Sequence, residues 1–397
     1  MKKLRVGVLF GGRSGEHEVS LLSAASVLKA IDKKRYDVVP IGITKEGRWV
    51  TAAHAERLLR GHASDARRSR RLRAGDPETT SAAAVLAKGE GVVVPPIPGE
   101  SHSALVPFET SATELHPAQN PVDVDIIFPV LHGTFGEDGT IQGLLELADI
   151  AYVGAGVLGS AAGMDKDVMK RLFRDAGIPI VKHLTLLRSV WRADPKQVRK
   201  RIEGRLKYPI FVKPANLGSS VGISKVHDAS ELAAAMNEAA RYDRKIVIEE
   251  GVGGKKGKAR EIECSVLGND EPIASVPGEV VPIKEFYDYN AKYLDKGSKL
   301  IIPAELPSRK QSEVRRLAIA AFKAVDCAGL ARVDLLMEAG SGRMYVNEIN
   351  TIPGFTSISM YPKLWAATGI SYSELIDRLI QLGLERHADK KQNQYSR

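Results

Sequence analysis

The sequence is poor in cysteine and has no long apolar stretch. Its 397 residues include only two cysteines, Cys264 and Cys327, which lie far apart, and this excludes a disulfide framework and a zinc site of the usual spacing. The longest stretch without a charged residue, between Asp149 and Asp165, has 15 residues, fewer than the ~20 that a membrane helix needs. Arg5 interrupts the apolar start, so a signal peptide is not indicated. We therefore expect neither a membrane nor a secreted protein, and a reducing cytoplasm is the simplest compartment.

Positive charge is unevenly distributed along the chain. The net charge is +9, but residues 54–73 carry +5 of it, with seven arginines and two acids, and residues 386–397 carry another +3. The rest of the chain is close to neutral, and aromatic residues make up only 6%. A nucleic-acid-binding protein needs a basic face on its folded body, usually with aromatic or groove-reading elements. The two basic segments are more typical of a charged insert and a solvated tail, so we expect no nucleic-acid partner.

The first part of the chain predicts a strand–helix–strand unit. An apolar strand at residues 4–10 runs into two glycines, and a helix follows with apolar residues spaced i, i+3, i+4, i+7 over residues 21–31. A second strand covers residues 38–43. This order implies a parallel, Rossmann-like sheet, whose ligands lie at the carboxyl ends of the strands. Residues 11–18 are therefore in the right place for a site.

Periodicity is lost between residues 51 and 120, which we interpret as a long, variable and mobile insert. The sheet resumes at residues 124–130, and strands and helices continue from there without an internal repeat. We expect three parts: an N-terminal domain over 1–154 that includes the insert, a central subdomain over 155–249, and a C-terminal subdomain over 250–397.

A predicted hairpin over residues 331–350 carries the most informative side chains. With a turn at its Gly-Ser-Gly segment, Asp334 lies across from Glu348, and Arg332 lies across from Asn350. Two carboxylates and an amide oxygen are hard ligands that suit magnesium bound jointly with phosphates. A solvated hairpin face with a cross-strand salt bridge is the alternative. The uncharged loop that follows, rich in backbone N–H groups and hydroxyls, favours an oxyanion or carboxylate site beside a metal.

A second candidate is Lys213, which ends an apolar strand predicted over residues 208–213. The Gly- and Ser-rich loop at residues 216–222 offers backbone donors and hydroxyls to a phosphate. A tight hairpin is the alternative interpretation. The lysine precedes the loop, and the chain contains no G-x-x-x-x-G-K-[ST] sequence, so this is not a Walker A motif.

The G-x-G-x-x-G match at residues 154–159 is a weak signal for a dinucleotide site. Such a site needs a helix that opens at the last glycine and an acidic residue at the end of the next strand, about 20 residues further on. Asp175 has that spacing, but it lies inside a predicted helix capped by Asp165. We therefore reject a dehydrogenase.

Several segments together resemble the D-alanine–D-alanine ligases of the ATP-grasp superfamily. They occur in the family's order and span nearly the whole chain outside the insert, and their combination is far more specific than any one of them. The segments are residues 11–20, 131–139, 164–166, 212–222, 286–293, 332–334 and 347–362. The resemblance implies an α/β protein with the ATP-grasp fold, in which an N-terminal Rossmann-like domain with a parallel sheet precedes two α+β subdomains that clasp ATP.

For the nucleotide, the resemblance implies a set of binding residues with separate roles. The set is Lys166, Lys213, Ser219, Ser220, Glu249, Glu250, Val252 and Glu261. The lysines would hold the ATP phosphates and the serines would cover them from a closing loop. The residues from Glu249 to Val252 would face the adenine, and Glu261 would bind the ribose. Metal ions, two per site and either Mg²⁺ or Mn²⁺, would be held by Asp334, Glu348 and Asn350.

The resemblance also implies which residues bind the amino-acid substrates. Glu16 would grip the ammonium of the first D-alanine and would be linked through Ser219 to Tyr293 on a mobile loop. His132 ends a predicted sheet strand, where by itself it would be a turn histidine bonded to backbone; the resemblance assigns it to the second amino-acid site. The intact segment at residues 286–293 favours D-alanine as the second substrate.

The remaining implied residues serve the reaction itself. Arg332 and the Gly354 N–H would stabilise the negative oxygen, and Ser359 with Met360 would receive the terminal carboxylate. A free carboxylate is a poor acyl donor, so the first D-alanine would attack the γ-phosphate and become an acyl phosphate. The amine of the second D-alanine would then attack this group through a tetrahedral intermediate, with water excluded.

The leading hypothesis is ATP-dependent ligation of two D-alanines for peptidoglycan precursor synthesis, by a cytoplasmic homodimer as the family implies. A related ligase that joins D-lactate or D-serine is the nearest alternative. From other classes, the alternatives are a nucleic-acid-binding module that uses the arginine-rich insert and a catalytically inactive nucleotide sensor. Turnover that survives deletion of residues 67–73 would argue against the module, and phosphate release that depends on D-alanine would exclude the sensor.

Overall fold

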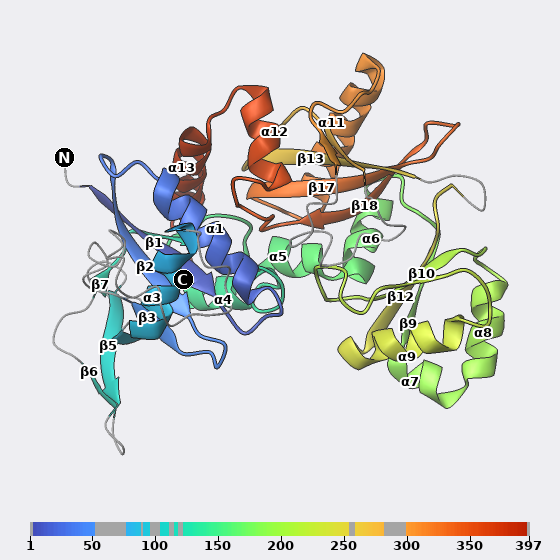
Figure 1. The fold of residues 1–397 in the computed structure, drawn as a ribbon, viewed down its shortest axis with the longest axis horizontal. Helices are drawn as coiled ribbons and strands as arrows, with labels where there is room; N and C mark the ends of the chain where they lie inside the picture. Colours follow the sequence, from blue (N-terminus) through green and yellow to red (C-terminus); the bar gives the residue numbers. More distant parts are fainter. Residues whose placement is uncertain are drawn as a thin grey trace. The chain divides into compact units, whose positions relative to one another are not determined.

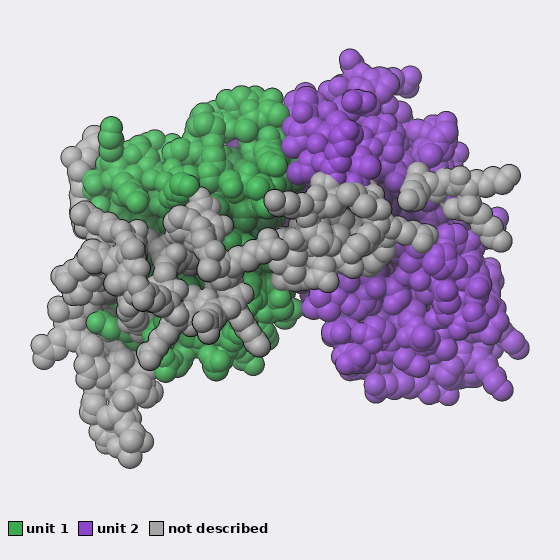
Figure 2. All heavy atoms as spheres, viewed as in Figure 1, with its two compact units in different colours: residues 1–157, 352–397 green, residues 158–351 purple. Residues whose placement is uncertain are grey.

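The computed structural model describes residues 3–51, 77–88, 90–95, 104–110, 115–117, 122–253, 259–281 and 299–394. The chain divides into two compact units (Figure 2): residues 1–157 with 352–397, called unit 1, and residues 158–351, called unit 2. None of the described helices is both long and apolar enough to cross a membrane.

Unit 1 is built on one sheet, in which the described strands follow the order β6-β5-β4-β3-β2-β1-β8 with β7 beside β5 (Figure 1). The strands are β1 (Leu4–Gly11), β2 (Tyr36–Ile43), β3 (Trp49–Thr51), β4 (Glu90–Val93), β5 (Ala104–Thr110), β6 (Leu115–Pro117), β7 (Val122–Asp123) and β8 (Ile126–Pro129). The helices are α1 (His17–Ala30), α3 (Pro77–Lys88), α4 (Thr140–Leu147), α12 (Met360–Thr368) and α13 (Tyr372–Lys390). Because β1 runs parallel to β2 and β8, the predicted strand–helix–strand unit is confirmed.

The interpretation of residues 51–120 as an insert outside the sheet is wrong for their described part. Strands β3, β4 and β5 continue the sheet in antiparallel fashion, and α3 packs against α1 and β2. Leu86 of α3 fills the space over Gly42, where an added Cβ would lie 2.6 Å from the leucine Cδ2. Strands β3 and β4 have only 3 and 4 residues, too few for a period-2 pattern to stand out. The arginine-rich residues 67–71 lie outside the described part of the chain.

The last part of the chain, residues 352–397, packs with unit 1. Helix α13 contacts α1 and β8, and the ring of Phe355 meets the ring of Phe128 edge-on at 5.7 Å. The buried aromatic residues of this segment, Phe355, Tyr361 and Trp365, thus share the core of the N-terminal sheet. The sequence instead suggested one C-terminal subdomain over 250–397, and the three-part division stays a prediction.

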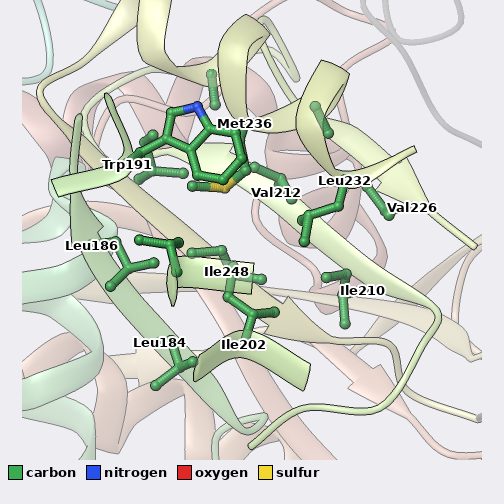
Figure 3. Packing of buried hydrophobic residues seen from close by; sticks show 14 of the residues in the cluster. Leu184, Leu186, Trp191, Ile202, Ile210, Val212, Val226, Leu232, Met236 and Ile248 are labelled. Atoms are coloured by element: carbon green, nitrogen blue, oxygen red, sulfur yellow. The ribbon is translucent and has the colours of Figure 1, made fainter. Parts of the chain in front are cut away.

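The first sheet of unit 2 has the order β11-β10-β12-β9. Its elements, with the two helices that precede it, are α5 (Val157–Met164), α6 (Lys166–Asp175), β9 (His183–Leu187), α7 (Arg188–Ala193), α8 (Pro195–Glu203), β10 (Ile210–Pro214), β11 (Ser224–Val226), α9 (Leu232–Tyr242) and β12 (Lys245–Glu250). Val212 of β10 and Ile248 of β12 pack with Trp191 in a buried apolar cluster beneath the helices (Figure 3). Because side chains alternate along a strand, Lys213 and Glu249 point to the opposite face.

The second sheet of unit 2 has the order β16-β15-β13-β17-β18, with β14 beside β13. Its elements are β13 (Arg260–Gly268), β14 (Ile273–Ala274), β15 (Gly278–Val281), β16 (Lys299–Ile301), α11 (Ser308–Ala324), β17 (Gly329–Met337) and β18 (Met344–Asn350). Helix α11 packs on β13, β17 and β18. Pro277 separates β14 from β15, because it has no N–H to donate to a strand partner.

Candidate active site

The β17–β18 hairpin has the predicted register. Asp334 pairs with Glu348, and Arg332 pairs with Asn350. The register shifts after Asp334, and Asn347 is the extra residue of this bulge. Bulges change the direction of neighbouring side chains and are frequent next to active sites. The side chains of Asp334 and Glu348 are 16% and 22% exposed, so the hairpin holds both carboxylates largely out of water.

A third carboxylate joins this patch from β13, where Glu263 lies directly across from Asp334. Arg332 lies between the two: its Nε is 2.6 Å from Asp334 Oδ1 and 3.1 Å from Glu263 Oε2, and its Nη2 donates to Asp334 Oδ2 at 2.7 Å. Asn350 Nδ2 donates to the same Oδ2 at 3.3 Å. With Glu348, the patch therefore holds three carboxylates against one guanidinium, and like charges this close need cations nearby.

Helix α6 delivers two lysines to the same region. Asp165 caps the helix as predicted, because its Oδ1 accepts hydrogen bonds from two backbone N–H groups of the first turn, both at 3.1 Å. Lys166 and Lys170 are four residues apart and so share one face of the helix. Lys166 Nζ donates to the Leu217 carbonyl at 2.9 Å and lies 3.5 Å from Glu348 Oε2.

Lys170 has no exposed surface, and it lies next to a buried carboxylate. Its Nζ is 2.9 Å from Glu249 Oε1 and donates to the Asn347 carbonyl at 3.2 Å; Lys213 Nζ donates to Glu249 Oε2 at 2.7 Å. Burial lowers the pKa of Lys170, and it would lower the pKa of Lys213 too, but Glu249 and Glu348 hold that pKa above its ordinary value. Burial would raise the pKa of Glu249, but the two lysines keep it well below its ordinary value. Two amines on one carboxylate leave positive charge available for an anion.

A cavity between the two sheets of unit 2 collects most of the residues expected to bind the nucleotide and the metal. Those that line it are Lys213, Ser220, Glu249, Glu250, Val252, Glu261, Asp334 and Glu348. Val181, Ile223 and Leu336 add apolar walls. Such walls with a few convergent polar groups are typical of a small-molecule site, and they suit a flat heterocyclic base. Lys166 contacts the lining residue Glu348, whereas Ser219 is not part of the lining.

The loop between β10 and β11 has an unusual backbone. Ser219 and Ser220 have φ angles of 50° and 58°, a region that residues other than glycine rarely adopt. Neighbouring contacts hold the loop: Lys166 bonds the Leu217 carbonyl, and Gly222 lies so close to the Tyr242 ring that an added Cβ would be 2.6 Å from Cδ2. Such backbone conformations cluster at ligand-binding loops.

In unit 1, a second cluster lies at the carboxyl ends of β1 and β8. Glu16 precedes α1, His132 and Glu137 follow β8, and their ligand atoms all lie within 4.8 Å of one another. Both ring nitrogens of His132 have partners, however, because Nδ1 is 3.1 Å from the Ile352 carbonyl oxygen and Nε2 is 2.9 Å from Ser23 Oγ. Burial lowers the pKa of His132 to about 4, and the Ile352 carbonyl offsets this only in part. The cluster therefore suits an ammonium ion, held by two carboxylates, better than a metal.

The loop before α12 also belongs to unit 1. Gly354 lies beside Ser359, since an added Cβ on the glycine would be 3.1 Å from Ser359 Oγ. Ser359 precedes Met360, the first residue of α12, and its Oγ accepts a hydrogen bond from the Thr356 N–H at 3.1 Å. Backbone N–H groups at the start of a helix favour a negatively charged ligand.

The predicted site residues thus fall into two sets, each within one unit. Unit 2 holds Lys166, Lys213, Ser219, Ser220, Glu249, Glu250, Val252, Glu261, Arg332, Asp334, Glu348 and Asn350, and unit 1 holds Glu16, His132, Gly354, Ser359 and Met360. Tyr293 and the segment 286–293 lie outside the described residues, so the link from Glu16 through Ser219 to Tyr293 stays a prediction.

Four residues of these clusters were not predicted: Ser23, Glu137, Lys170 and Glu263. Lys170 follows Lys166 by four residues, so a helical-face argument would have found it. Ser23 follows the buried Ser20 by three residues on the core-facing side of α1. Glu263 had no such signal, because its place depends on the pairing of β13 with β17, two strands far apart in the sequence.

The hairpin patch fits a divalent cation. Every side chain that it offers besides Arg332 is an oxygen donor: the carboxylates of Asp334, Glu348 and Glu263 and the amide of Asn350. Oxygen ligands of this kind suit Mg²⁺, which keeps part of its coordination for water or phosphate oxygens. The three carboxylates outnumber the two cations that contact them, Arg332 and Lys166, which leaves the patch negative charge that such an ion neutralises.

Comparison with known proteins gives concordant matches over the whole chain. The family model described as D-ala D-ala ligase N-terminus matches residues 5–155, and the one described as D-ala D-ala ligase C-terminus matches residues 172–381. A relative from Thermoanaerobacter sp. (strain X514), named D-alanine--D-alanine ligase, is 50% identical over 393 residues, 98% of this chain and 99% of the relative. The solved structure of the D-alanine-D-alanine ligase from Coxiella burnetii matches with a TM-score of 0.79 and 35% identity over 99% of this chain and 97% of that chain. The VanG D-Ala:D-Ser ligase from Enterococcus faecalis matches with a TM-score of 0.78 and 35% identity over 96% of this chain and 100% of that chain.

Proposed function

The chain belongs to the D-alanine–D-alanine ligase family, and we propose that its unit 2 cavity binds ATP and metal while its unit 1 cluster binds the amino acids. Family membership makes the protein an ATP-dependent ligase that joins two D-alanines, and the expected ATP-grasp fold is confirmed. The assignment of individual residues below is the proposal, and it is supported by the contacts of each cluster.

ATP would lie with its base against the apolar walls of the cavity and its ribose at Glu261. Lys166 and Lys213 would hold the phosphates, with Ser219 and Ser220 covering them. The raised pKa of Lys213 keeps its ammonium charged, and phosphoryl transfer is accelerated mainly by such fixed positive charge around the transferred group. The first D-alanine gains its leaving group in this step, because its carboxylate attacks the γ-phosphate and becomes an acyl phosphate.

Asp334, Glu348 and Asn350 would hold divalent cations, and we propose two ions of Mg²⁺ or Mn²⁺ per site. Bound metal would neutralise charge on the phosphate oxygens as the γ-phosphoryl group is transferred. Glu263 adds a fourth oxygen-bearing side chain next to Asp334. Arg332, which contacts both Glu263 and Asp334 in this structure, is the proposed cation for the negative oxygen of the reaction.

The unit 1 cluster would bind the amino acids. Glu16 is buried and lies beside Glu137, so the two carboxylates offer an ammonium ion a site with little competition from water. The Gly354 N–H would stabilise the oxygen of the tetrahedral intermediate, and Ser359 with Met360 would receive the carboxylate of the second D-alanine. The amine of this second D-alanine displaces phosphate and forms the peptide bond.

D-Alanine is the proposed second substrate. Relatives at 45–50% identity over nearly the whole chain are named D-alanine--D-alanine ligase. At 35% identity, the similar solved structures include both a D-alanine-D-alanine ligase and a D-Ala:D-Ser ligase. Offering D-alanine, D-serine and D-lactate together, with mass detection of the products, tests this choice. D-Alanyl-D-alanine as the dominant product is the expected result, and a dominant mixed product would overturn it.

The observation that carries the residue assignment is the hairpin register, which sets Asp334 beside Glu348 on the wall of the cavity. We expect Glu348→Ala to abolish ADP formation that depends on D-alanine. Glu338→Ala is a matched control, since Glu338 lies just past the end of β17 of the same hairpin, bonds Ser341 in the turn and does not line this cavity. Substantial turnover in Glu348→Ala, or an equal loss in the control, would contradict the metal assignment.

The compartment, the oligomeric state and the domain assignment are also proposals. We propose that the protein acts in the cytoplasm, where its dipeptide product would enter peptidoglycan precursor synthesis. We propose a homodimer, which light scattering on the purified protein tests directly. We also propose that unit 2 corresponds to the parts of the ATP-grasp fold that clasp the nucleotide.

A further inference from the structure

A chain of buried hydrogen bonds in unit 1 connects α1 to the loop at residues 352–355. Ser23 of α1 is fully buried, and its Oγ lies 2.9 Å from His132 Nε2. The Phe355 N–H donates to the same Oγ at 3.3 Å. On the other side of the imidazole ring, His132 Nδ1 lies 3.1 Å from the Ile352 carbonyl oxygen. This chain of hydrogen bonds therefore contacts the loop twice, at the residues on either side of the Pro353–Gly354 pair.

The direction of every bond in this chain follows from its ends. A carbonyl oxygen only accepts, so His132 Nδ1 must carry the proton that it donates to Ile352. In the neutral ring Nε2 is then an acceptor, and the Ser23 hydroxyl donates to it. The Ser23 oxygen keeps a lone pair for the Phe355 N–H. All donors and acceptors of the chain are therefore matched, and the matching requires neutral His132 with its proton on Nδ1.

A protonated ring would break this matching. Its Nε2 would donate to the Ser23 oxygen, and the Ser23 hydroxyl group would then have no acceptor among these hydrogen-bond partners. Ser23 is fully buried and His132 is 2% exposed, so water does not replace the lost partner, and an unsatisfied buried donor is costly. The burial that lowers the pKa of His132 acts in the same direction.

We propose that Ser23 is a positioning residue of the ligation reaction: it locks neutral His132 and the Phe355 amide together, and so fixes the backbone that presents the Gly354 N–H. This inference rests on the proposed role of Gly354 and deepens it. His132 then serves the reaction by holding the loop through both ring nitrogens, not by bonding the second amino acid through them.

Other contacts hold the Phe355 carbonyl and ring, so the remaining position of the loop backbone depends on this chain of hydrogen bonds. The Phe355 carbonyl accepts a hydrogen bond from the Tyr372 hydroxyl at 2.5 Å, and the Phe355 ring packs between the rings of Tyr361 and Phe128, at 5.8 and 5.7 Å. Without the Ser23 hydroxyl, the Phe355 N–H and His132 Nε2 both lose their partners. The loop can then satisfy them only by moving, and a displacement of about 1 Å at a reacting centre can reduce a rate roughly 100-fold.

The test compares Ser23→Ala with Ser26→Ala. Ser26 lies on the same helix and is also buried, but its Oγ donates to the Leu22 carbonyl within α1 at 3.0 Å. Ser26→Ala therefore also removes a buried hydroxyl group from α1, but one whose hydrogen bond stays within the helix. In Ser23→Ala we expect kcat for dipeptide formation to fall roughly 10- to 100-fold, while KM for ATP stays within twofold because the nucleotide residues lie in unit 2. In Ser26→Ala we expect both constants to stay near the wild-type values.

The tautomer of His132 provides a second readout that needs no turnover. In ¹⁵N-detected imidazole spectra of the wild-type protein at pH 7, we expect His132, assigned by its loss in His132→Asn, to carry its proton on Nδ1. The Phe355 amide should exchange with solvent faster in Ser23→Ala than in Ser26→Ala.

The outcomes separate this inference from the proposed function. Equal kinetic effects of the two serine variants, or a His132 proton on Nε2, would overturn the positioning role even if the wild-type protein makes the dipeptide. A wild-type protein that makes no dipeptide would overturn the proposed function instead, and the tautomer and the exchange rate would still decide whether the hydrogen-bond chain exists.

Discussion

At the scale of single residues, the largest energetic consequences concern charge that is held away from water. Lys170 contacts Glu249 with no exposed surface of its own. Its removal leaves the buried Oε1 of Glu249 without this partner, while Lys213 still pairs with Oε2. We expect Lys170→Met to lower the free energy of unfolding by about 1–3 kcal/mol and to raise KM for ATP, since Glu249 lines the cavity proposed for the nucleotide. Urea unfolding followed by circular dichroism measures the first effect, and initial rates at varied ATP measure the second.

Lys200→Met is the matched control for this change. Lys200 also lies on a helix, α8, but it is exposed, and surface substitutions usually change stability by less than about 0.5 kcal/mol. If Lys170→Met were no more destabilising than Lys200→Met, the buried ion pair would have no energetic role.

The buried neutral His132 makes the stability of unit 1 depend on pH. Its pKa is about 4 in the folded state against about 6.5 in an unfolded chain, so between these values the unfolded state binds more protons and stability falls as the pH falls. From pH 7 to pH 5 this loss amounts to about 2 kcal/mol. Below the folded pKa no further loss arises from this group. Glu16 and Glu137 lie beside the ring, and their negative charge opposes the effect.

We therefore expect His132→Asn to show a smaller loss of stability between pH 7 and pH 5 than the wild-type protein, by about 2 kcal/mol. Urea unfolding at both pH values measures this difference. The control is His227→Asn, because His227 is exposed and substitutions at exposed positions usually change stability by less than about 0.5 kcal/mol. An unchanged pH dependence in His132→Asn would show that the histidine binds its proton in both states alike.

At the scale of elements, the sequence predicted those structures whose signal is local. The hairpin with Asp334 opposite Glu348 followed from period-2 alternation around a Gly-Ser-Gly turn, and the structure has this register. The strands β3 to β5 were missed because each is stabilised by its neighbours in the sheet, and short strands carry little pattern of their own. Glu263 was missed for the same reason: non-local pairing sets its place.

Helix α6 gives a prediction at this scale, because its N-cap supports two lysines, Lys166 and Lys170, that contact carboxylates lining the cavity. Asp165→Ala removes two capping hydrogen bonds and an ion pair with Lys245, so it should cost about 1–2 kcal/mol of unfolding free energy. The first turn carries Lys166, and fraying there should raise KM for ATP several-fold. Thermal unfolding and initial rates measure the two effects.

Asp194→Ala is the matched control, since Asp194 caps α8 through the Gln197 N–H at 2.9 Å. It should cost a similar capping energy but leave KM for ATP unchanged. Equal changes of KM in the two variants would mean that loss of stability alone weakens nucleotide binding.

At the scale of the whole molecule, the proposed division of labour follows the two compact units. The residues proposed for the nucleotide and the metal lie within unit 2, and those proposed for the amino acids lie within unit 1, apart from Arg332 and Ser219, which unit 2 contributes. Each cluster is stabilised by contacts inside its own unit: Lys170 with Glu249 in one, and Ser23 with His132 in the other.

The proposed assignment of ligands to the two units predicts where they protect the backbone from hydrogen exchange. A ligand at about 100 times its Kd stabilises the state that binds it by about 2.7 kcal/mol, and exchange slows where opening requires that the ligand leave. With saturating ADP and Mg²⁺, we expect the largest protection in peptides from β10, β12, β17 and β18. Peptides that contain Glu16, His132 or Gly354 should respond mainly to D-alanyl-D-alanine. The full-length protein, analysed by exchange and mass spectrometry with each ligand alone, provides the measurement. Protection by ADP that is greatest in unit 1 would contradict the assignment of the nucleotide to unit 2, and Glu348→Ala, which should lose the protection that depends on Mg²⁺, serves as the control.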